Sequence, residues 1–179
     1  MTQEDFCQEL IDADVVRVDV IPATGSTFPI PFAVQNVSAM KGQYPNASSA
    51  VDGASFASAI LTVALADGND VDAIMKNTIT HDVTPSREAM GIVRTHTTQI
   101  PIEMGFQTLR KKEKDLQGVD FHVVLTTYDG RQYLAYGCPN SSQFALSEKA
   151  GENGTMTAKI IVKSMSGLIF LGDESSTSS

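Results

Sequence analysis

The sequence predicts a mainly β protein of the α+β class: an antiparallel β-sandwich or rolled sheet with one flanking α-helix, a long loop and terminal arms. Several runs alternate apolar and polar residues as strands do, one run has a helical pattern, and a turn dipeptide joins two β-rich runs. The chain has 179 residues, of which 42% are hydrophobic, enough for one domain with a core. We expect an N-terminal arm over residues 1–13, one β-rich domain over 14–171 and a flexible C-terminal tail over 172–179.

The strongest signal is a β-hairpin around the dipeptide Asp129-Gly130. Both residues tolerate positive φ, so the dipeptide favours a two-residue type I′ turn, which would pair Leu125 with Leu134. The flanking runs carry apolar residues on both faces. We therefore expect this hairpin to lie inside a sheet that is covered on each side.

The first third of the chain predicts one strand and much loop. Val15–Val20 alternates, with the even-numbered valines facing the core and Arg17 and Asp19 facing away. Three prolines make residues 21–34 an extended loop or an edge strand. Lys41–Gly53 is a long polar loop of the kind that often contacts partners.

Two predictions concern the segment that follows. Ala54–Leu65 alternates like a strand, and this pattern favours a strand over a helix, which stays an open alternative. Asn69 or Asp70 could cap a short helix that runs through Met75.

The middle of the chain predicts a helical turn and then a strand. Thr84-Pro85 resembles an N-cap followed by proline at the first helical position, which predicts a turn through Met90. Ile92–Phe106 is β-rich. Pro101 would remove a hydrogen bond of the ladder, so we expect an edge or a break there.

Thr108–Gln117 has the clearest helical pattern. Thr108 is the expected cap, Leu109 and Leu116 lie on one stripe, and Gly118 is the expected end. Because the stripe is narrow and the remaining residues are charged, we expect this helix on the outside of the sheet.

The rest of the chain closes the fold. Residues 138–154 have the composition of a loop, which Phe144 and Leu146 could anchor. Thr155–Leu171 predicts one bent strand or two short ones, with Gly167 as a bulge or turn.

No motif in the chain predicts a reaction. The three histidines lack the HExxH or HxH spacing of metal ligands, and the aspartates of residues 67–72 do not match a calcium loop. The GxSxG elbow and the glycine-rich phosphate loops are missing. We therefore expect no catalytic residues, no cofactor-binding or metal site, and no enzymatic activity.

The net charge, the cysteine spacing and the N-terminal sequence limit the partners, crosslinks and location that we expect for the chain. The net charge of −8 argues against nucleic acid as a general partner. Cys7 and Cys138 have no CxxC partner, so we expect neither a metal site nor a disulfide. The acidic N-terminus does not resemble a signal peptide, and no apolar run approaches the ~20 residues of a membrane anchor.

One basic cluster stands out in this acidic chain. Four of its 13 basic residues lie within the predicted helix: Arg110, Lys111, Lys112 and Lys114. They could form a docking face for an acidic neighbour, including another copy of the chain, or they could form a solvated outer face. The sequence leaves both interpretations open.

The order of the predicted elements resembles the tail-tube and related tube- or ring-forming proteins of tailed bacteriophages. The resemblance covers about residues 14–171 and lies in architecture and composition. It implies a virion structural subunit that assembles in the host cytoplasm into a tail tube or a neck or tail ring, by sheet extension and arm exchange. Its partners would be itself and other virion proteins, with DNA only as passing cargo that is not specifically bound.

In this interpretation the subunit contacts come from the N-terminal arm, the long loop and the basic helix. The candidate residues are Phe6, Leu10, Tyr44, Pro45, Arg110, Lys111, Lys112 and Lys114. The alternative function is a β-sandwich binding module for a carbohydrate or a host-surface ligand. Tyr44, Tyr128 and Tyr133 could stack on such a ligand, although the lack of tryptophan counts against this alternative.

Overall fold

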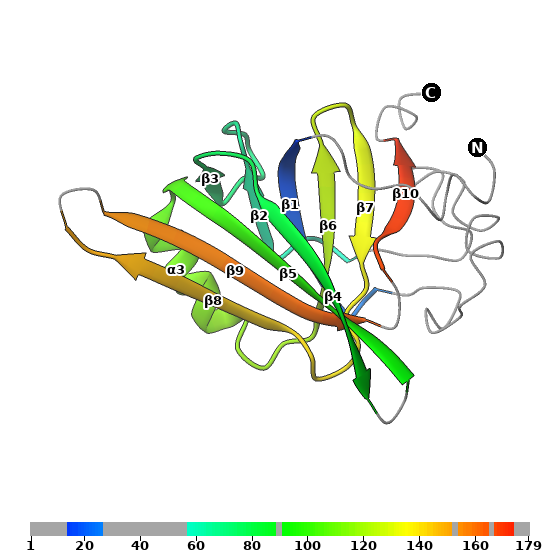
Figure 1. The fold of residues 1–179 in the computed structure, drawn as a ribbon. Coiled ribbons are helices and arrows are strands. Elements are labelled where there is room, and N and C mark those ends of the chain that lie inside the picture. Colours follow the sequence, from blue (N-terminus) through cyan, green and yellow to red (C-terminus); the bar gives the residue numbers. More distant parts are fainter. Residues whose placement is uncertain (1–13, 27–56, 89–90, 152–153, 165–166, 174–179) are drawn as a thin grey trace.

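The computed structural model describes residues 14–26, 57–88, 91–151, 154–164 and 167–173. They form one open mixed sheet and one helix, which confirms the mainly β fold with a single helix (Figure 1). Nine strands follow the order β10-β7-β6-β1-β2-β3-β5-β9-β8, and β4 pairs with β5. The elements are β1 (Val15–Pro22), β2 (Leu61–Ala64), β3 (Ala73–Met75), β4 (Thr80–Glu88), β5 (Gly91–Met104), α3 (Phe106–Asp115), β6 (Phe121–Thr127), β7 (Arg131–Ala135), β8 (Gln143–Lys149), β9 (Thr155–Ser164) and β10 (Ile169–Asp173).

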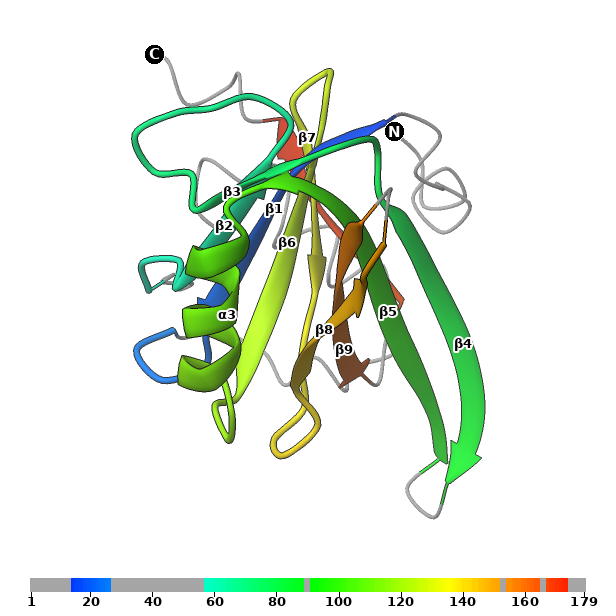
Figure 2. The ribbon, with the colours of Figure 1, turned by 90° about the vertical axis from the view of Figure 1, so that its left-hand side faces the viewer.

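The sheet curls around a single apolar core. Strands β7, β6, β1 and β2 face β5, β9 and β8, and α3 lies beside β3 and β8 (Figure 2). The largest fully buried side chains are those of Phe121, Leu61, Met75, Ile100, Leu109, Leu125, Leu134 and Ile160. A rolled sheet, rather than two stacked sheets, is therefore the form that the predicted β fold takes.

The predicted hairpin is present as β6 and β7, but its register differs by one residue. Leu125 lies opposite Tyr133, not Leu134, because the loop has three residues, Tyr128–Gly130. Gly130 has φ 90° and donates its N–H to the Thr127 carbonyl at 3.0 Å, as in a turn that ends in a left-handed glycine. The two-residue turn was therefore the wrong prediction, whereas the buried position was right: every residue of β6 is buried.

Replacement of Gly130 by valine tests this turn. A β-branched residue is strained at positive φ, so Gly130→Val should lower the free energy of unfolding by about 1 kcal/mol or more. Gly130→Asn is the matched control, because asparagine tolerates positive φ better and should lose less. Denaturant titrations of both variants measure the difference. Equal stability of the two variants would contradict the left-handed turn.

β1 is the predicted strand, but a bulge changes its inner face. The pairing with β6 is irregular between Val15 and Arg17, so Val15, and not Val16, joins Val18 and Val20 in the core. Such an extra residue shifts the alternation by one position. The expectation that Val16 faces the core was therefore wrong.

The strand prediction for Ala54–Leu65 is right for its second half, but the helix expected through Met75 is a strand instead. β2 is buried at every position, and β3 pairs with it in parallel. Asp72 donates its N–H to the Thr62 carbonyl at 2.8 Å, and its carboxylate accepts the Thr62 N–H at 2.9 Å. The segment that Asn69 or Asp70 was expected to cap is thus joined to β2 through Asp72.

The helical turn expected at Thr84-Pro85 is also wrong. Both residues lie within β4, which pairs with β5 continuously from Thr80 to Glu88. An edge strand tolerates proline when its nitrogen points away from the neighbouring strand, and β4 has only β5 beside it within the described residues.

β5 continues through Pro101, where it changes partner on one edge. The Pro101 carbonyl accepts a hydrogen bond from Lys76 N at 2.8 Å. The N–H and C=O groups of one strand residue point to the same edge, so the missing N–H falls between β4, whose pairing stops at Gln99, and β3, whose pairing begins at Ile102. The other edge pairs with β9 throughout. The break expected at this proline is therefore confined to one edge.

α3 begins at Phe106 rather than Thr108. Its N-cap is Gly105, with φ 95°, and a Cβ there would come within 2.8 Å of the Ala73 Cα, so only glycine fits without a shift. Leu109 and Leu116 are buried as predicted. The helix end near Gly118, at φ 75°, also agrees.

The C-terminal third contains one strand that the sequence did not predict. β8 runs through the segment expected to be loop, and Phe144 is buried in the core. Thr155–Leu171 forms two strands, β9 and β10, separated around Gly167, which agrees with the second of the two forms predicted.

Candidate functional site

The residues predicted to contact other subunits are only partly described. Phe6, Leu10, Tyr44 and Pro45 lie outside the described residues, so their contacts remain predictions. The basic residues lie on α3. Of the tyrosines considered for stacking, Tyr44 is not described, Tyr128 is 73% exposed, and Tyr133 is buried in the core. The stacking role expected of Tyr133 is therefore wrong.

α3 uses part of its charge within the chain, against the outer edge of β8. Arg110 Nε donates to Glu148 Oε1 at 2.8 Å, with both side chains about half exposed. Glu113 Oε2 accepts the backbone N–H of Leu146 at 2.5 Å. Because this N–H points away from β9, the helix covers an edge that another strand could otherwise join. Lys111 and Lys114 stay exposed.

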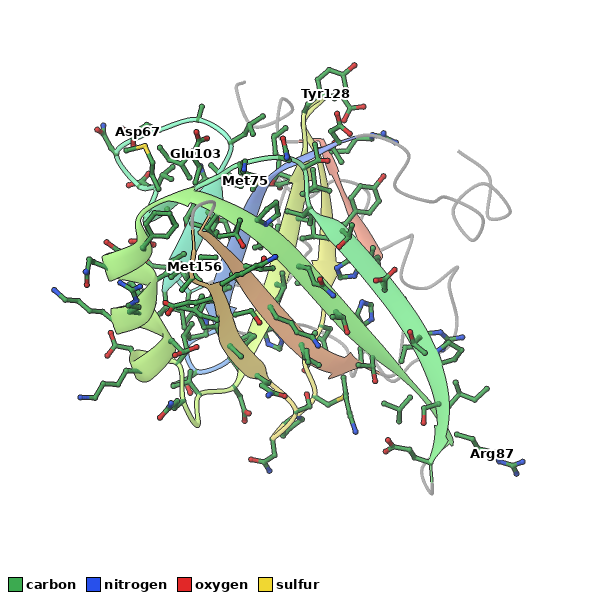
Figure 3. All side chains as sticks on the ribbon, turned by 60° about the vertical axis from the view of Figure 1, so that its left-hand side comes forward. Asp67, Met75, Arg87, Glu103, Tyr128 and Met156 are labelled. Carbon is green, nitrogen blue, oxygen red and sulfur yellow. The ribbon has the colours of Figure 1, made fainter. Side chains whose placement is uncertain are left out.

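The most exposed part of the described sheet is the hairpin of β4 and β5, which projects beyond the core (Figure 2). We call β4, residues 80–88, the arm; Arg87 marks its far end (Figure 3). All of β4 except His81 is exposed. The arm is therefore held mainly by backbone pairing with β5.

Alternation along β5 sets the direction of the β4 backbone. The Pro101 carbonyl points to the edge of β5 that β4 and β3 share. The odd-numbered residues of β5 before it therefore turn their N–H and C=O groups toward β4, and their partners, the even-numbered β4 residues, bond to β5. The odd-numbered residues, His81, Val83, Pro85 and Arg87, turn theirs outward. No other strand among the described residues pairs with this edge.

His81 and His96 join β4 to β5 through their side chains. His81 Nε2 lies 3.2 Å from His96 Nδ1, and His81 Nδ1 lies 2.7 Å from Thr98 Oγ1. His96 is 1% exposed. Burial and the neighbouring His96 lower the pKa of His81 to about 3, so His81 is neutral at pH 7.

The sequence did not reveal this pair, because the histidines lie 15 residues apart. The signal that could have found it is the pairing of β4 with β5, which aligns His81 with Thr98 and places the next inward residue pair beside it. The helical turn predicted at Thr84-Pro85 concealed that pairing.

The third histidine is also buried and neutral. His122 Nδ1 accepts the N–H of Gly137 at 2.9 Å, which assigns the proton to Nε2, and its ring stacks on Tyr136 with centroids 4.5 Å apart. Burial lowers the pKa of His122 to about 4, against the opposing effect of Asp120. This arrangement joins the end of β7 to β6.

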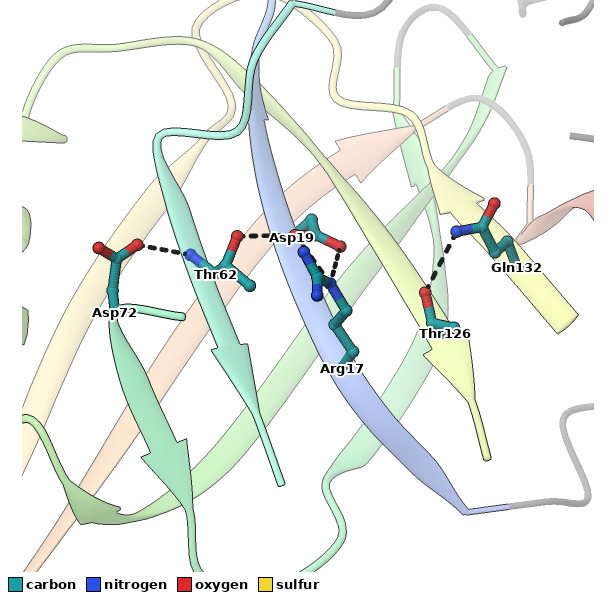
Figure 4. A network of polar contacts seen from close by, with 6 residues as sticks. All are labelled: Arg17, Asp19, Thr62, Asp72, Thr126 and Gln132. Atoms are coloured by element: carbon teal, nitrogen blue, oxygen red, sulfur yellow. Dashed lines mark hydrogen bonds and ion pairs between the residues drawn. The ribbon is translucent and has the colours of Figure 1, made fainter. Parts of the chain in front are cut away.

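A polar network ties β1, β2 and β3 together on the outer face of the sheet (Figure 4). Asp19 accepts from Arg17 Nε at 3.1 Å and from Thr62 Oγ1 at 2.7 Å, and Asp72 accepts the Thr62 N–H. Nearby, Gln132 Nε2 donates to Thr126 Oγ1 at 3.4 Å. The carboxylates serve strand pairing, which is a structural role.

Two further findings concern the described part of the chain. Within it, no three side chains of the metal-binding types come together around one point. The described helix is too short and too polar to cross a membrane.

Loss of the Glu113 carboxylate should cost more than loss of Arg110. Glu113→Ala leaves the Leu146 N–H without its acceptor, which should lower the free energy of unfolding by about 1 kcal/mol. Arg110→Ala removes an exposed ion pair and should cost less than about 0.5 kcal/mol. Glu113→Gln keeps an acceptor oxygen and serves as the control. Chemical denaturation that ranked Arg110→Ala as the more damaging change would contradict this role.

Stability should fall on acidification. A histidine whose folded pKa is lowered binds fewer protons when folded, so its contribution is fully present above pH 6.5 and is lost as pH falls through the folded pKa. For His122 the window is about pH 6.5 to 4, and the loss is about 3 kcal/mol at most. His122→Gln should flatten this part of the stability profile. An equally steep profile in the variant would show that His122 does not titrate as described.

The comparisons with known proteins supply no relative. No family model, no curated protein and no solved structure matches this chain. The geometry of the described residues is therefore the basis on which a function can be argued.

Proposed function

We propose that this protein is a non-enzymatic structural subunit that assembles with copies of itself into a ring or tube. The observation that carries the proposal is the outward edge of β4, a nine-residue exposed strand on a projecting arm. The resemblance to tail-tube and ring proteins of tailed bacteriophages suggests the setting: a virion, with other virion proteins as further partners.

Backbone chemistry supports a strand as the occupant of this edge. His81, Val83 and Arg87 direct N–H groups outward, and Pro85 adds a carbonyl to theirs. A regular row of donors and acceptors is satisfied best by another strand, which is how sheet-edge recognition works. Each such hydrogen bond contributes about 1 kcal/mol net.

A comparison of the strand edges of the described sheet supports a specific contact at β4. α3 covers the edge of β8, whereas β4 and β10 end the described sheet without a cover from the described residues. Pro85 and the charged residues Asp82, Arg87 and Glu88 are devices that limit unspecific pairing. The edge is thus guarded against general aggregation while most of its bonding groups stay available.

Two open ends of one sheet suit head-to-tail assembly. We propose that β4 of one copy meets β10 of the next. A contact between two different surfaces repeats, and it closes into a ring or continues as a tube. The binding-module alternative loses one of its tyrosines to the core, so we do not favour it.

Val83→Pro tests the contact with little disturbance of the subunit. The substitution removes an outward N–H and leaves the bonds to β5 intact. Assembly should weaken at least tenfold, through the lost bond and the bulk of the ring at the edge. Val83→Ala, which shortens the side chain but keeps the N–H, should assemble like the wild type. Light scattering and negative-stain microscopy at matched concentrations measure both.

A mixing experiment tests the direction of growth. Val83→Pro keeps the β10 edge, so a small fraction of it should cap wild-type assemblies and shorten them. Unchanged assembly of the variant alone would reject the β4 contact. A wild-type protein that stays monomeric at all concentrations and ionic strengths tested would reject the function itself.

A further inference from the structure

We propose that the His81–His96 pair is an acid-sensitive latch that holds the arm against β5 and thereby controls the assembly edge. The latch rests on the proposed function for its role in assembly, but its effect on the arm is a property of the single subunit. Its basis is the contact of two imidazoles across two strands, one of which has support on only one edge among the described residues.

The hydrogen bond between the two imidazole rings shows why their protonation should weaken the contact. A distance of 3.2 Å between His81 Nε2 and His96 Nδ1 leaves room for one hydrogen between the two nitrogens. Two neutral rings satisfy this arrangement, and His81 Nδ1 completes it with Thr98. When both rings are protonated, two N–H groups face each other, the hydrogen bond is lost and two like charges meet in a buried site.

The described residues on the inward face around the pair are apolar, polar or cationic. The inward face of β4, β5 and β9 around the pair carries Val83, Pro85, Arg87, Arg94, Ile160, Val162 and Ser164. Across the core, β6 and β7 present Val123, Leu125, Tyr133 and Ala135, and Arg131, which bonds to Asp129 at the hairpin turn. Asp82 and Glu88 of β4 lie on the opposite face, where Glu88 bonds to Lys163 at 3.4 Å. Among these described strands, the charges on the inward face of the arm are cationic.

A fall in pH should therefore separate the arm from β5 before the core unfolds. A detached histidine takes up a proton near pH 6.5, whereas His81 in the latch resists protonation, so falling pH favours the detached state. β4 has little buried side-chain surface to hold it, and local opening occurs where such support is least. Without an ordered β4, the outward edge is lost and assemblies should fall apart while the rest of the sheet stays folded.

Amide hydrogen exchange on dilute, monomeric protein tests the latch directly. The protection factors of the Asp82 and Thr84 amides, which bond to β5, should fall roughly 20-fold or more between pH 7 and pH 5, the ratio expected for a group with a folded pKa of about 3. The amides of Val123 and Leu125 in the core should keep their protection. Unchanged protection of β4 at pH 5 would overturn the proposal.

Two variants separate the latch from general acid sensitivity. His81→Gln keeps a hydrogen-bonding side chain that does not titrate, so the fall in β4 protection should disappear; His122→Gln, away from the arm, should behave like the wild type there. If the β4 amides of His81→Gln are already unprotected at pH 7, His96→Gln takes its place in the comparison with the wild-type protection profile. An acid response in His81→Gln equal to that of the wild type rejects the latch.

Light scattering on concentrated protein completes the test. Wild-type assemblies should dissociate between pH 7 and pH 5, and those of His81→Gln should persist. Absence of assembly at pH 7 would count against the proposed function, while the exchange measurement on monomers would still judge the latch. Assemblies that withstand pH 5 although β4 has lost its protection would show that the arm is not the assembly contact.

Discussion

The arrangement of this protein depends on one strand, β5, and on the alternation of its backbone groups. Its fourteen residues pair with β9 along one edge and with β4 and then β3 along the other. The exchange of partners occurs at Pro101, which has no N–H to offer at that point. One part of β5 therefore belongs to the rolled sheet around the core. The other part carries β4 outward, with one backbone edge of β4 turned away from the sheet.

The same alternation links the arm to the histidine pair. Residues of β4 whose backbone points outward have side chains on the inward face, so His81 contributes both to the open edge and to the contact with His96. A change in the protonation of His81 can therefore affect the open edge of β4 directly, without a structural change in the core. At the other end of the sheet the helix covers the edge of β8 through Glu113. The described fold protects one edge and leaves another accessible.

Local patterns predicted the elements whose partners are near in sequence. The β6–β7 hairpin, β1 and the apolar stripe of α3 follow from periodicity and turn residues, and the structure confirms them. The hairpin register was missed because the Thr127 side chain stabilises a three-residue loop: its hydroxyl accepts the Arg131 N–H at 3.1 Å and bonds to Asp129. Residue propensities do not include this side-chain contact, so they do not predict the register.

The failures have a common physical cause. The helices expected after Asn69 or Asp70 and at Thr84-Pro85 are strands instead, because other strands bond to these segments: β2 to the first and β5 to the second. β8 has weak alternation and depends on Phe144 entering a core made by other strands. The histidine pair could not be recognised without the β4–β5 pairing, because its members share no motif.

The central claim is that the outward edge of β4 is where copies of this chain meet, and the amides on that edge report it most directly. In the monomer, the N–H groups of Val83 and Arg87 face away from β5 and should exchange freely with solvent. In the assembled protein the same two amides should become protected, while the Asp82 and Thr84 amides, already bonded to β5, should change little. Site-resolved exchange on dilute and assembled samples at pH 7 provides the comparison. Assemblies in which Val83 and Arg87 exchange as fast as in the monomer would contradict the account.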